Sequence, residues 1–376
     1  MSNVKKKIER IKAALSHRES DRVAVGEFFW SGFISRCRKK WGDTFDAYRF
    51  WDLDYIVITP NMDPVIQQFD VVSQNEEDLL IKTGFGALIR RSGDKPMPHF
   101  DSFSVNEPSL MAKFGFDDPA DTRRFYNGGD DQLNCVGDAL LRNIPAWDER
   151  VNMYKDEFCL FGSVCEPYEY LWRIIGTENA MLWIASDPDE IKEFVDRIGK
   201  FMLLFAEAQI KAAAGRIQGM YIWGDIAYRN GMLFSPEVWR KVFKPHVKNI
   251  INLCHQHDLM VIYHGCGDAR PIYGDLVQIG LDAYNPLEVK ADLDVVKLKK
   301  EYKTKLAFCG NIDVRVLEKG DLKEIEAEIL YKLHAAKGGG WICQSDHSIS
   351  SYVAPESYDY ALKTLRKHGK YPLNLK

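Results

Sequence analysis

Hydrophobic residues recur along this chain as short apolar runs, each followed by a turn and a longer amphipathic segment. Runs of this length that are rich in β-branched or aromatic residues are typical of strands. Eight are predicted: Val23–Phe28, Tyr55–Thr59, Leu160–Val164, Met220–Trp223, Leu259–His264, Ala283–Asn285, Leu306–Cys309 and Trp341–Cys343. Eight strands that alternate with helices predict an α/β fold, a closed parallel (β/α)8 TIM barrel.

Signals at helix starts favour the same architecture. Ser186-Asp187-Pro188 and Ser235-Pro236-Glu237 each place a proline in the first turn of a predicted helix. An open doubly wound sheet is the alternative, and it would need a glycine-rich phosphate turn after the first strand. Gly26-Glu27-Phe28-Phe29-Trp30 does not provide that turn. We therefore expect a single barrel domain over residues 1–376.

The second and third predicted strands are separated by about a hundred residues, too many for one crossover connection. Within this stretch, Leu79–Arg91 has glycines near its centre and is predicted to form a hairpin. We expect an insertion at about residues 64–158 within the same domain. Its aromatic and polar residues, with those of Phe28–Trp51, are predicted to form a lid or substrate wall over the barrel mouth.

Composition and charge narrow the location and the partners. The 376 residues carry a formal net charge of −4, so no basic surface is expected that would bind nucleic acid or an anionic membrane. The first twenty residues form an amphipathic helical pattern rather than a secretory signal, and no apolar segment is long enough to span a bilayer. We expect a cytoplasmic protein whose eight cysteines are reduced and serve as core residues, metal ligands or nucleophiles.

Polar and metal-binding residue types follow most of the predicted strands. In a parallel barrel these strand ends open on one face, where barrel enzymes carry their catalytic groups. The residues there are Glu27, Asn61, Asp63, Cys165, Glu166, Asp225, His264, Cys266, Asn285, Glu288, Cys309, Asp313, Cys343, Asp346 and His347. Glu27, Glu166, Asp225 and Asp346 are candidate catalytic acids, metal ligands or partners of His264, although such carboxylates also cap helices. His347 could equally be the neighbour of a helix cap.

The segment Tyr263-His264-Gly265-Cys266-Gly267 predicts half of a metal site. Residues two apart on a strand point the same way, so the His264 imidazole and the Cys266 thiol face one point. Zinc prefers thiolate and imidazole, and a catalytic zinc uses three protein ligands with one open position. Cys309 and Cys343 are the alternatives for the third ligand, and binding by both would give a closed structural site. The other interpretation is that these residues bind no metal, and that the histidine and the three cysteines are ordinary side chains of the barrel rim and core.

Several segments together resemble the uroporphyrinogen-decarboxylase superfamily. They are the opening DRVAVGEFFW and, between Trp223 and Gly369, GDIAYRNGMLFSPEVW, YHGCG, IGLDAYNPLE, CGNIDVRVLEKG and GGGWICQSDHSI. The resemblance implies the same closed barrel. The true decarboxylases carry an arginine-rich signature after the first strand, and FFWSGFISRCRKKWG lacks it. The other branch, similar to methylcobamide:CoM methyltransferases and O-demethylase methyltransferases, has a zinc motif that corresponds here to His264, Cys266 and Cys343, and its spacing favours Cys343 over Cys309.

The resemblance implies a zinc-dependent, cobalamin-dependent methyltransferase. It would move a methyl group between a small substrate and the cobalt of a corrinoid carried by a separate partner protein, because no cobalamin-binding segment is evident in this chain. The aromatic-rich front of the chain favours a methoxylated, aromatic substrate. The alternatives are a decarboxylase acting on a porphyrinogen or another carboxylate, and a barrel whose zinc is structural. The donor, the acceptor, the direction of transfer and whether the chain forms a homodimer stay open.

Overall fold

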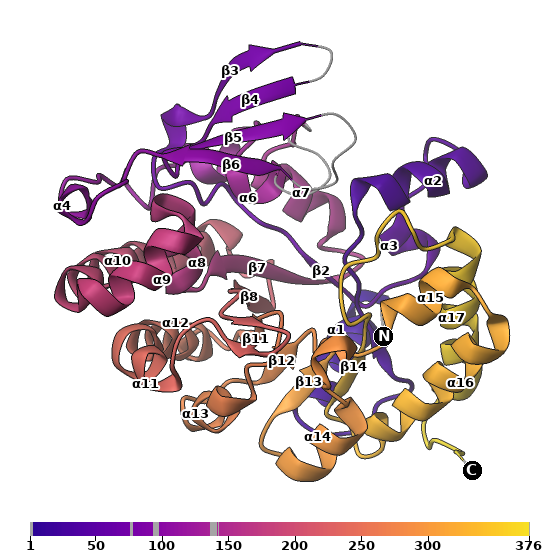
Figure 1. Cartoon of the computed structure of the whole chain (residues 1–376). Helices are drawn as coiled ribbons and strands as arrows, with labels where there is room; N and C mark the ends of the chain where they lie inside the picture. Colours follow the sequence, from indigo (N-terminus) through magenta and orange to yellow (C-terminus); the bar gives the residue numbers. More distant parts are fainter. Residues whose placement is uncertain (1–2, 76–77, 93–97, 136–140, 142, 376) are drawn as a thin grey trace.

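The computed structural model describes residues 3–75, 78–92, 98–135, 141 and 143–375. It confirms the predicted α/β barrel, in which eight parallel strands lie in the order β1-β14-β13-β12-β11-β8-β7-β2 and helices surround them (Figure 1). The strands are β1 (Ala24–Val25), β2 (Tyr55–Val57), β7 (Cys159–Cys165), β8 (Gly219–Trp223), β11 (Met260–His264), β12 (Ala283–Asn285), β13 (Ala307–Cys309) and β14 (Trp341–Cys343). Each of the eight predicted strands overlaps one of them.

Most helices lie outside the strands. They are α2 (Ser31–Trp41), α3 (Ala47–Phe50), α8 (Pro167–Ile175), α9 (Thr177–Ser186), α10 (Pro188–Ala213), α11 (Pro236–Val238), α12 (Lys244–Gln256), α13 (Tyr273–Gln278), α14 (Val295–Tyr302), α15 (Val314–Lys319), α16 (Leu322–Lys332) and α17 (Pro355–His368). Both predicted helix starts are confirmed, since α10 and α11 begin at their prolines. The first helix, α1 (Asn3–Leu15), packs Ile11 and Leu15 against the side chains that fill the barrel. In the part of the chain that the structure describes, no helix could cross a membrane.

Alternation along the strands divides the core into two layers. Side chains such as Tyr55, Phe161 and Ile262 fill the barrel interior, whereas their neighbours Ile56, Leu160 and Val261 pack against the outer helices. This period of two follows from strand geometry. It also decides which polar side chains at the strand ends reach the inside of the mouth.

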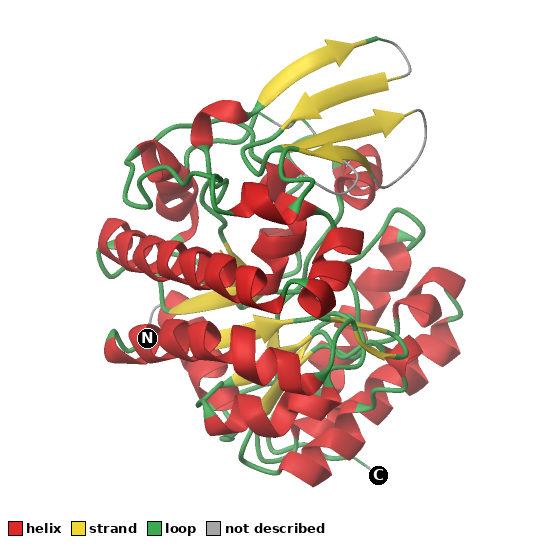
Figure 2. Ribbon diagram, turned by 60° about the vertical axis from the view of Figure 1, so that its left-hand side comes forward, coloured by secondary structure: helices red, strands yellow, loops and turns green. Residues whose placement is uncertain are grey.

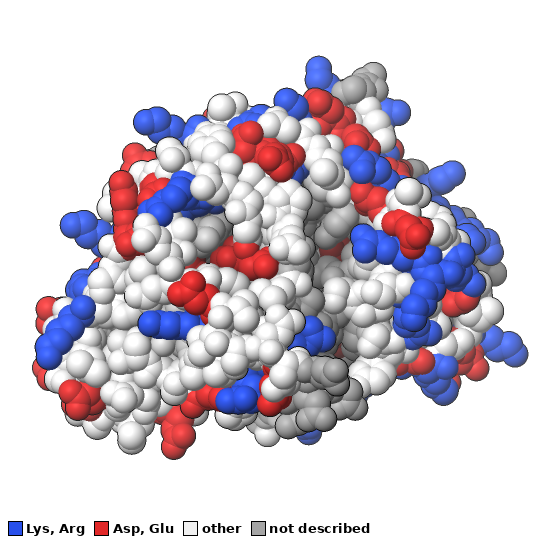
Figure 3. Space-filling view, turned by 90° about the horizontal axis from the view of Figure 1, so that it is seen from above, with Lys and Arg blue, Asp and Glu red and all other residues white. Residues whose placement is uncertain are grey.

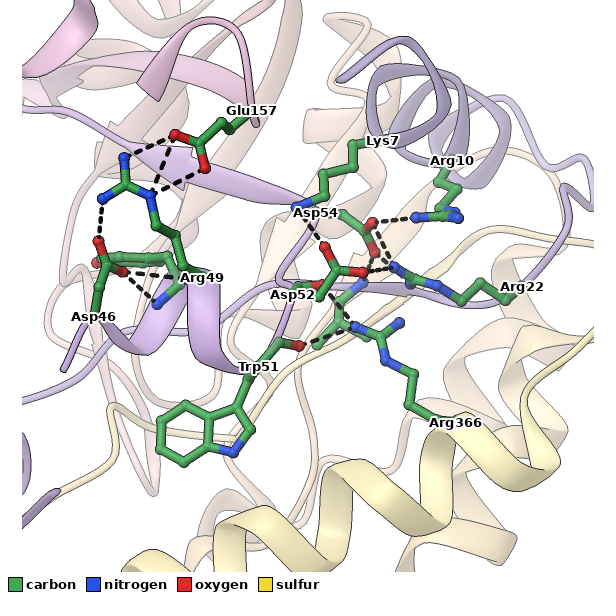
Figure 4. A network of polar contacts seen from close by, with 12 residues as sticks. Lys7, Arg10, Arg22, Asp46, Arg49, Trp51, Asp52, Asp54, Glu157 and Arg366 are labelled. Atoms are coloured by element: carbon green, nitrogen blue, oxygen red, sulfur yellow. Dashed lines mark hydrogen bonds and ion pairs between the residues drawn. The ribbon is translucent and has the colours of Figure 1, made fainter. Parts of the chain in front are cut away.

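A buried ion cluster joins β1 to β2, which are the two ends of the strand order (Figure 4). The backbone N–H of Asp54 donates to the Val25 carbonyl oxygen at 2.8 Å, and Asp54 Oδ2 accepts from the Val25 N–H at 2.8 Å. Arg10 and Arg22 pair with the same fully buried carboxylate at 3.0 and 2.6 Å. Asp54 therefore closes the barrel where the strand ladder ends.

The insertion between β2 and β7 contains a four-stranded antiparallel sheet above the barrel (Figures 1 and 2). Its strands are β3 (Asp70–Gln74), β4 (Asp78–Lys82), β5 (Ala87–Ser92) and β6 (His99–Phe103), in that order across the sheet. The predicted hairpin is confirmed as β4 and β5. Short helices follow: α4 (Pro108–Met111), α5 (Arg123–Tyr126), α6 (Gln132–Cys135) and α7 (Trp147–Tyr154). Residues 76–77, 93–97, 136–140 and 142 of the predicted insertion lie outside the described residues.

Candidate metal centre and active site

His264 ends β11 with its imidazole fixed on one side. Its Nδ1 lies 2.7 Å from Asn285 Oδ1, at the end of the neighbouring strand β12, and 3.2 Å from the Tyr221 hydroxyl. The Tyr221 hydroxyl donates to the same amide oxygen at 2.5 Å. Because an amide oxygen only accepts hydrogen bonds, it favours the tautomer with the proton on Nδ1. The Nε2 lone pair is then free to bind a cation.

Cys266 and Asp225 meet His264 on its Nε2 side. Cys266 Sγ is 3.6 Å and Asp225 Oδ1 is 3.7 Å from His264 Nε2. Asp225 Oδ1 also accepts from the Cys266 N–H at 3.0 Å, which fixes the turn after β11. Gly265 is required in this turn, since a Cβ there would lie 2.6 Å from the Tyr284 hydroxyl oxygen. The ligand atoms of the three side chains lie within 4.8 Å of one another.

Two further side chains approach Cys266 from other strand ends. Cys266, Glu288 and His347 also have ligand atoms within 4.8 Å of one another. Glu288 follows β12, and its Oε2 accepts from the Gly267 N–H at 2.9 Å. His347 follows β14 and offers a second imidazole. Thiol, imidazole and carboxylate donors at one point are the set that zinc binds in proteins, so these residues fit the metal that the resemblance implies.

Electrostatics around Cys266 favour a cation. Burial raises the pKa of its thiol well above the ordinary value, and the carboxylates of Asp225 and Glu288 raise it further. A divalent cation bound to the sulfur would reverse this shift, because a coordinated thiol loses its proton. The carboxylates of Asp225 and Glu288 would then stabilise the bound cation, whereas without a cation they destabilise the thiolate.

The geometry differs from the sequence expectation for the third ligand. Among the described residues, the groups of converging metal-binding side chains include neither Cys343 nor Cys309. Ile342 points into the barrel, so its neighbour Cys343 faces the helices and lines a small cavity with Tyr358. Cys309 lies in the barrel interior among apolar side chains. Instead of Cys343, His347, four residues further along the chain, approaches Cys266. The signal for it in the sequence was the tandem Asp346-His347, three and four residues after the last strand ends.

Three of the four candidate acids are buried and hold backbone N–H groups. Glu27 accepts from the N–H of Phe28 at 3.0 Å and from the N–H and hydroxyl of Ser345 at 3.1 and 2.7 Å. Glu166 caps α8 by accepting from the Tyr168 N–H. Burial raises the pKa of Glu27 and of Glu166 to about 8. Both carboxyls therefore favour the protonated form at neutral pH.

Asp346 positions the site rather than facing it. Its carboxylate accepts from the N–H groups of Val289 and Val314, each at 2.9 Å, and so joins the loops after β12 and β13. Burial raises its pKa to about 6. The loop it holds carries Glu288. Asp225, whose side chain is 53% exposed, is the candidate acid on the open side of the centre.

A cavity of about 230 Å³ opens beside the centre. It is lined by Thr59, Leu133, Glu169, Arg173, Trp223, Gly224, Asp225 and His264. The Trp223 ring lies 5.1 Å from the His264 ring and 5.1 Å from the Phe28 ring, so aromatic side chains lie against the centre. Seen from above the inserted sheet, charges of both signs surround a groove across the middle of the molecule (Figure 3).

Comparison with models of protein families identifies the family of this chain. The model for uroporphyrinogen decarboxylase (URO-D) matches residues 139–368, which is more than half of the chain. The chain belongs to the URO-D family. This confirms the resemblance seen in the sequence. A search of curated protein sequences finds no significant match.

One solved structure supports the barrel, and two others show weaker similarity. A methyltransferase from Methanosarcina mazei is similar over 96% of this chain and 98% of its own, with a TM-score of 0.67 and 15% identity. A B12-independent methionine synthase from Shewanella sp. W3-18-1 matches 57% of this chain and 64% of its own, with a TM-score of 0.40 and 10% identity. A putative B12-independent methionine synthase from Listeria monocytogenes matches 93% and 96%, with a TM-score of 0.42 and 12% identity.

Proposed function

We propose that this member of the URO-D family is a zinc-dependent methyltransferase. It transfers a methyl group between a small methoxylated substrate and the corrinoid of a separate partner protein, in the cytoplasm. The observation that carries the proposal is the convergence of nitrogen, sulfur and oxygen donors on Cys266 at the barrel mouth. The barrel shared with the Methanosarcina mazei methyltransferase supports the reaction class.

The proposed ligands are His264, Cys266 and Asp225, whose ligand atoms converge, and Glu288 and His347 form a second such group with the same Cys266. Zinc bound there would supply Lewis acidity toward a methoxy oxygen, or lower the pKa of an acceptor thiol. Asn285 and Tyr221 keep the His264 ring turned toward the ligand position. Trp223 and Leu133 pack against the apolar part of a substrate in the cavity.

The proposal is tested by metal analysis together with a methyl-transfer assay. We expect the purified protein to hold stoichiometric zinc and to transfer methyl groups to a corrinoid protein supplied with methoxylated donors. His264→Ala and Cys266→Ser should lose both properties. Cys254→Ser is the matched control, because this buried cysteine lies in the last turn of α12, away from the mouth.

Three further variants separate the ligand sets. His347→Ala should weaken zinc binding, whereas Cys343→Ser and Cys309→Ser should retain it, because neither thiol belongs to a converging group among the described residues. If Cys343→Ser loses zinc and His347→Ala keeps it, the ligands are His264, Cys266 and Cys343, as the sequence motif implies. A metal-free wild-type protein that decarboxylates a porphyrinogen would overturn the proposal in favour of the reaction for which the family is named.

A further inference from the structure

The cavity beside His264 has a second polar wall, formed by one turn of α8. Glu169 and Arg173 lie four residues apart on this helix and both line the cavity. Nε and Nη2 of Arg173 both donate to Glu169 Oε1, at 2.8 and 2.6 Å. The two side chains are only 6% and 9% exposed. The wall therefore contains a buried guanidinium in a defined orientation.

The ion pair uses only part of the guanidinium. Arginine carries five N–H donors in a planar fork, and one carboxylate oxygen takes the two on the Nε side. Nη1 of Arg173 is buried and has no hydrogen-bond partner among the described residues. Buried charged donors are rarely left unpaired in native proteins, and each exception requires an explanation. A ligand oxygen in the cavity would provide the partner.

Neighbouring side chains hold this guanidinium in place. Glu169 Oε2 accepts from Trp172 Nε1 at 2.9 Å and from the Asp225 N–H at 3.3 Å. The Trp172 ring lies 4.5 Å from the guanidinium carbon, and Phe100 of the inserted sheet packs edge-on against that ring. Through Glu169, the arginine is thus joined to the same turn that carries Asp225 beside His264.

We propose that Arg173 binds a carboxylate group of the substrate. A carboxylate matches the free edge of a guanidinium in shape and charge. His264 and Asp225 line the same cavity as Arg173, and Trp223 and Leu133 supply apolar surface in it. The substrate class is then a small methoxylated aromatic acid, with its carboxylate on Arg173 and its methoxy group toward Cys266. Only the identity of the reacting end rests on the proposed function.

Binding measurements can test the anchor apart from catalysis. The probes are 4-methoxybenzoate and its uncharged counterpart methoxybenzene, titrated calorimetrically into zinc-loaded and metal-free protein. We expect the wild type to bind the acid at least about tenfold more tightly than the ether in both states, because the charge-assisted pair does not involve the metal.

A double substitution is chosen so that no unpaired charge stays buried in the cavity wall. In Glu169→Gln/Arg173→Gln both charges are removed together, and the glutamine oxygen at position 169 can still accept from Trp172 and Asp225. This variant should lose the preference for the acid. Arg173→Lys, which keeps the charge without the planar edge, should bind the acid with intermediate affinity. Arg240→Gln, on the outer surface where its partner is Asp275, is the matched control and should bind as the wild type does.

Each outcome decides one of the two proposals. Equal acid binding by the wild type and the doubly neutral variant, or no preference for the acid in a folded wild type, overturns the role of Arg173. Acid binding that depends on Arg173 in a protein without zinc or methyl transfer supports the anchor and removes the proposed reaction. Methyl transfer from 4-methoxybenzoate that is indifferent to the double substitution keeps the reaction and overturns the anchor.

Discussion

His264 depends on one amide side chain for its tautomer. Asn285 Oδ1 faces Nδ1 at 2.7 Å, and its Nδ2 donates to the Cys309 carbonyl oxygen at 3.1 Å, so the amide cannot easily flip. We predict that Asn285→Ala weakens zinc affinity by about 10- to 100-fold, the usual effect of removing such a partner. Competition with a chromophoric chelator measures this. Asn152→Ala, a surface control on α7, should leave the affinity unchanged, and an unchanged affinity in Asn285→Ala would contradict the assigned role.

Glu27 gives a residue-scale prediction about pH. Burial raises its pKa from the ordinary 4.5 to about 8, so the folded protein holds this proton more tightly than the unfolded chain does. Its contribution to stability is complete below the unfolded pKa and is lost as the pH rises through about 8. The free energy of unfolding therefore falls as the pH rises.

The uncharged isostere Glu27→Gln isolates this contribution from the other buried carboxyls. Relative to the variant, the wild type should lose about 1.4 kcal/mol per pH unit across the steepest part of the range between the two pKa values. Urea denaturation at a series of pH values provides the measurement. Parallel curves for the two proteins would show that the carboxyl at position 27 titrates normally.

At the scale of elements, the seam between β1 and β2 depends on Asp54. Removing its carboxylate leaves Arg10 and Arg22 without their shared partner in a buried position and takes away the bond to the Val25 N–H. We predict that Asp54→Ala lowers the unfolding free energy by about 3–5 kcal/mol, the cost of breaking a buried ion pair from one side. Chemical denaturation tests this, with the exposed Asp43→Asn as control. A loss below about 1 kcal/mol would mean that the ladder closes without this cluster.

Strand alternation explains which site residues the sequence could predict. His264 and Cys266 share one strand end and one turn, so local spacing was enough to pair them. A third donor would have to come from another strand, and a one-residue change of parity there turns a side chain from the mouth to the helices. Ile342 fills the inward position on β14, which sends Cys343 outward. Spacing along the chain contains no information about that parity.

For the whole molecule, the barrel was predictable because each of its strands is a short apolar run followed by its own helix. The inserted sheet was predictable only in part. Asp78–Lys82 and Ala87–Ser92 are half-apolar and are joined by a glycine turn, whereas all five residues of Asp70–Gln74 are exposed and His99–Phe103 buries little. Edge strands that bury few side chains leave weak periodicity in a sequence. Two strands of four were therefore expected.

The same difference in burial predicts how the molecule opens. Among the described residues, the core of the inserted sheet consists of three buried side chains, Ile81, Ala87 and Ile89, with partly buried aromatic neighbours, whereas β8 and β11 contribute to the much larger core of the barrel. Amides protected by few buried contacts exchange through partial opening, at a lower free energy than global unfolding. We predict that amides of β4 and β5 exchange roughly ten times or more faster than those of β8 and β11.

Hydrogen–deuterium exchange with mass spectrometry distinguishes this from a single cooperative unit. Asp54→Ala weakens the barrel seam, which is far from the inserted sheet. If the sheet opens by itself, this substitution should change the exchange rates in β4 and β5 little. The exchange rates in β8 and β11 should rise in proportion to the lost unfolding free energy. The contrary result would be equal exchange rates in the sheet and the barrel, or equal acceleration of both by Asp54→Ala. It would mean that the contact between Phe100 and Trp172 couples the sheet to α8 strongly enough for both to unfold together. In that case an opening of the sheet could not expose the Arg173 wall of the cavity without loss of the barrel.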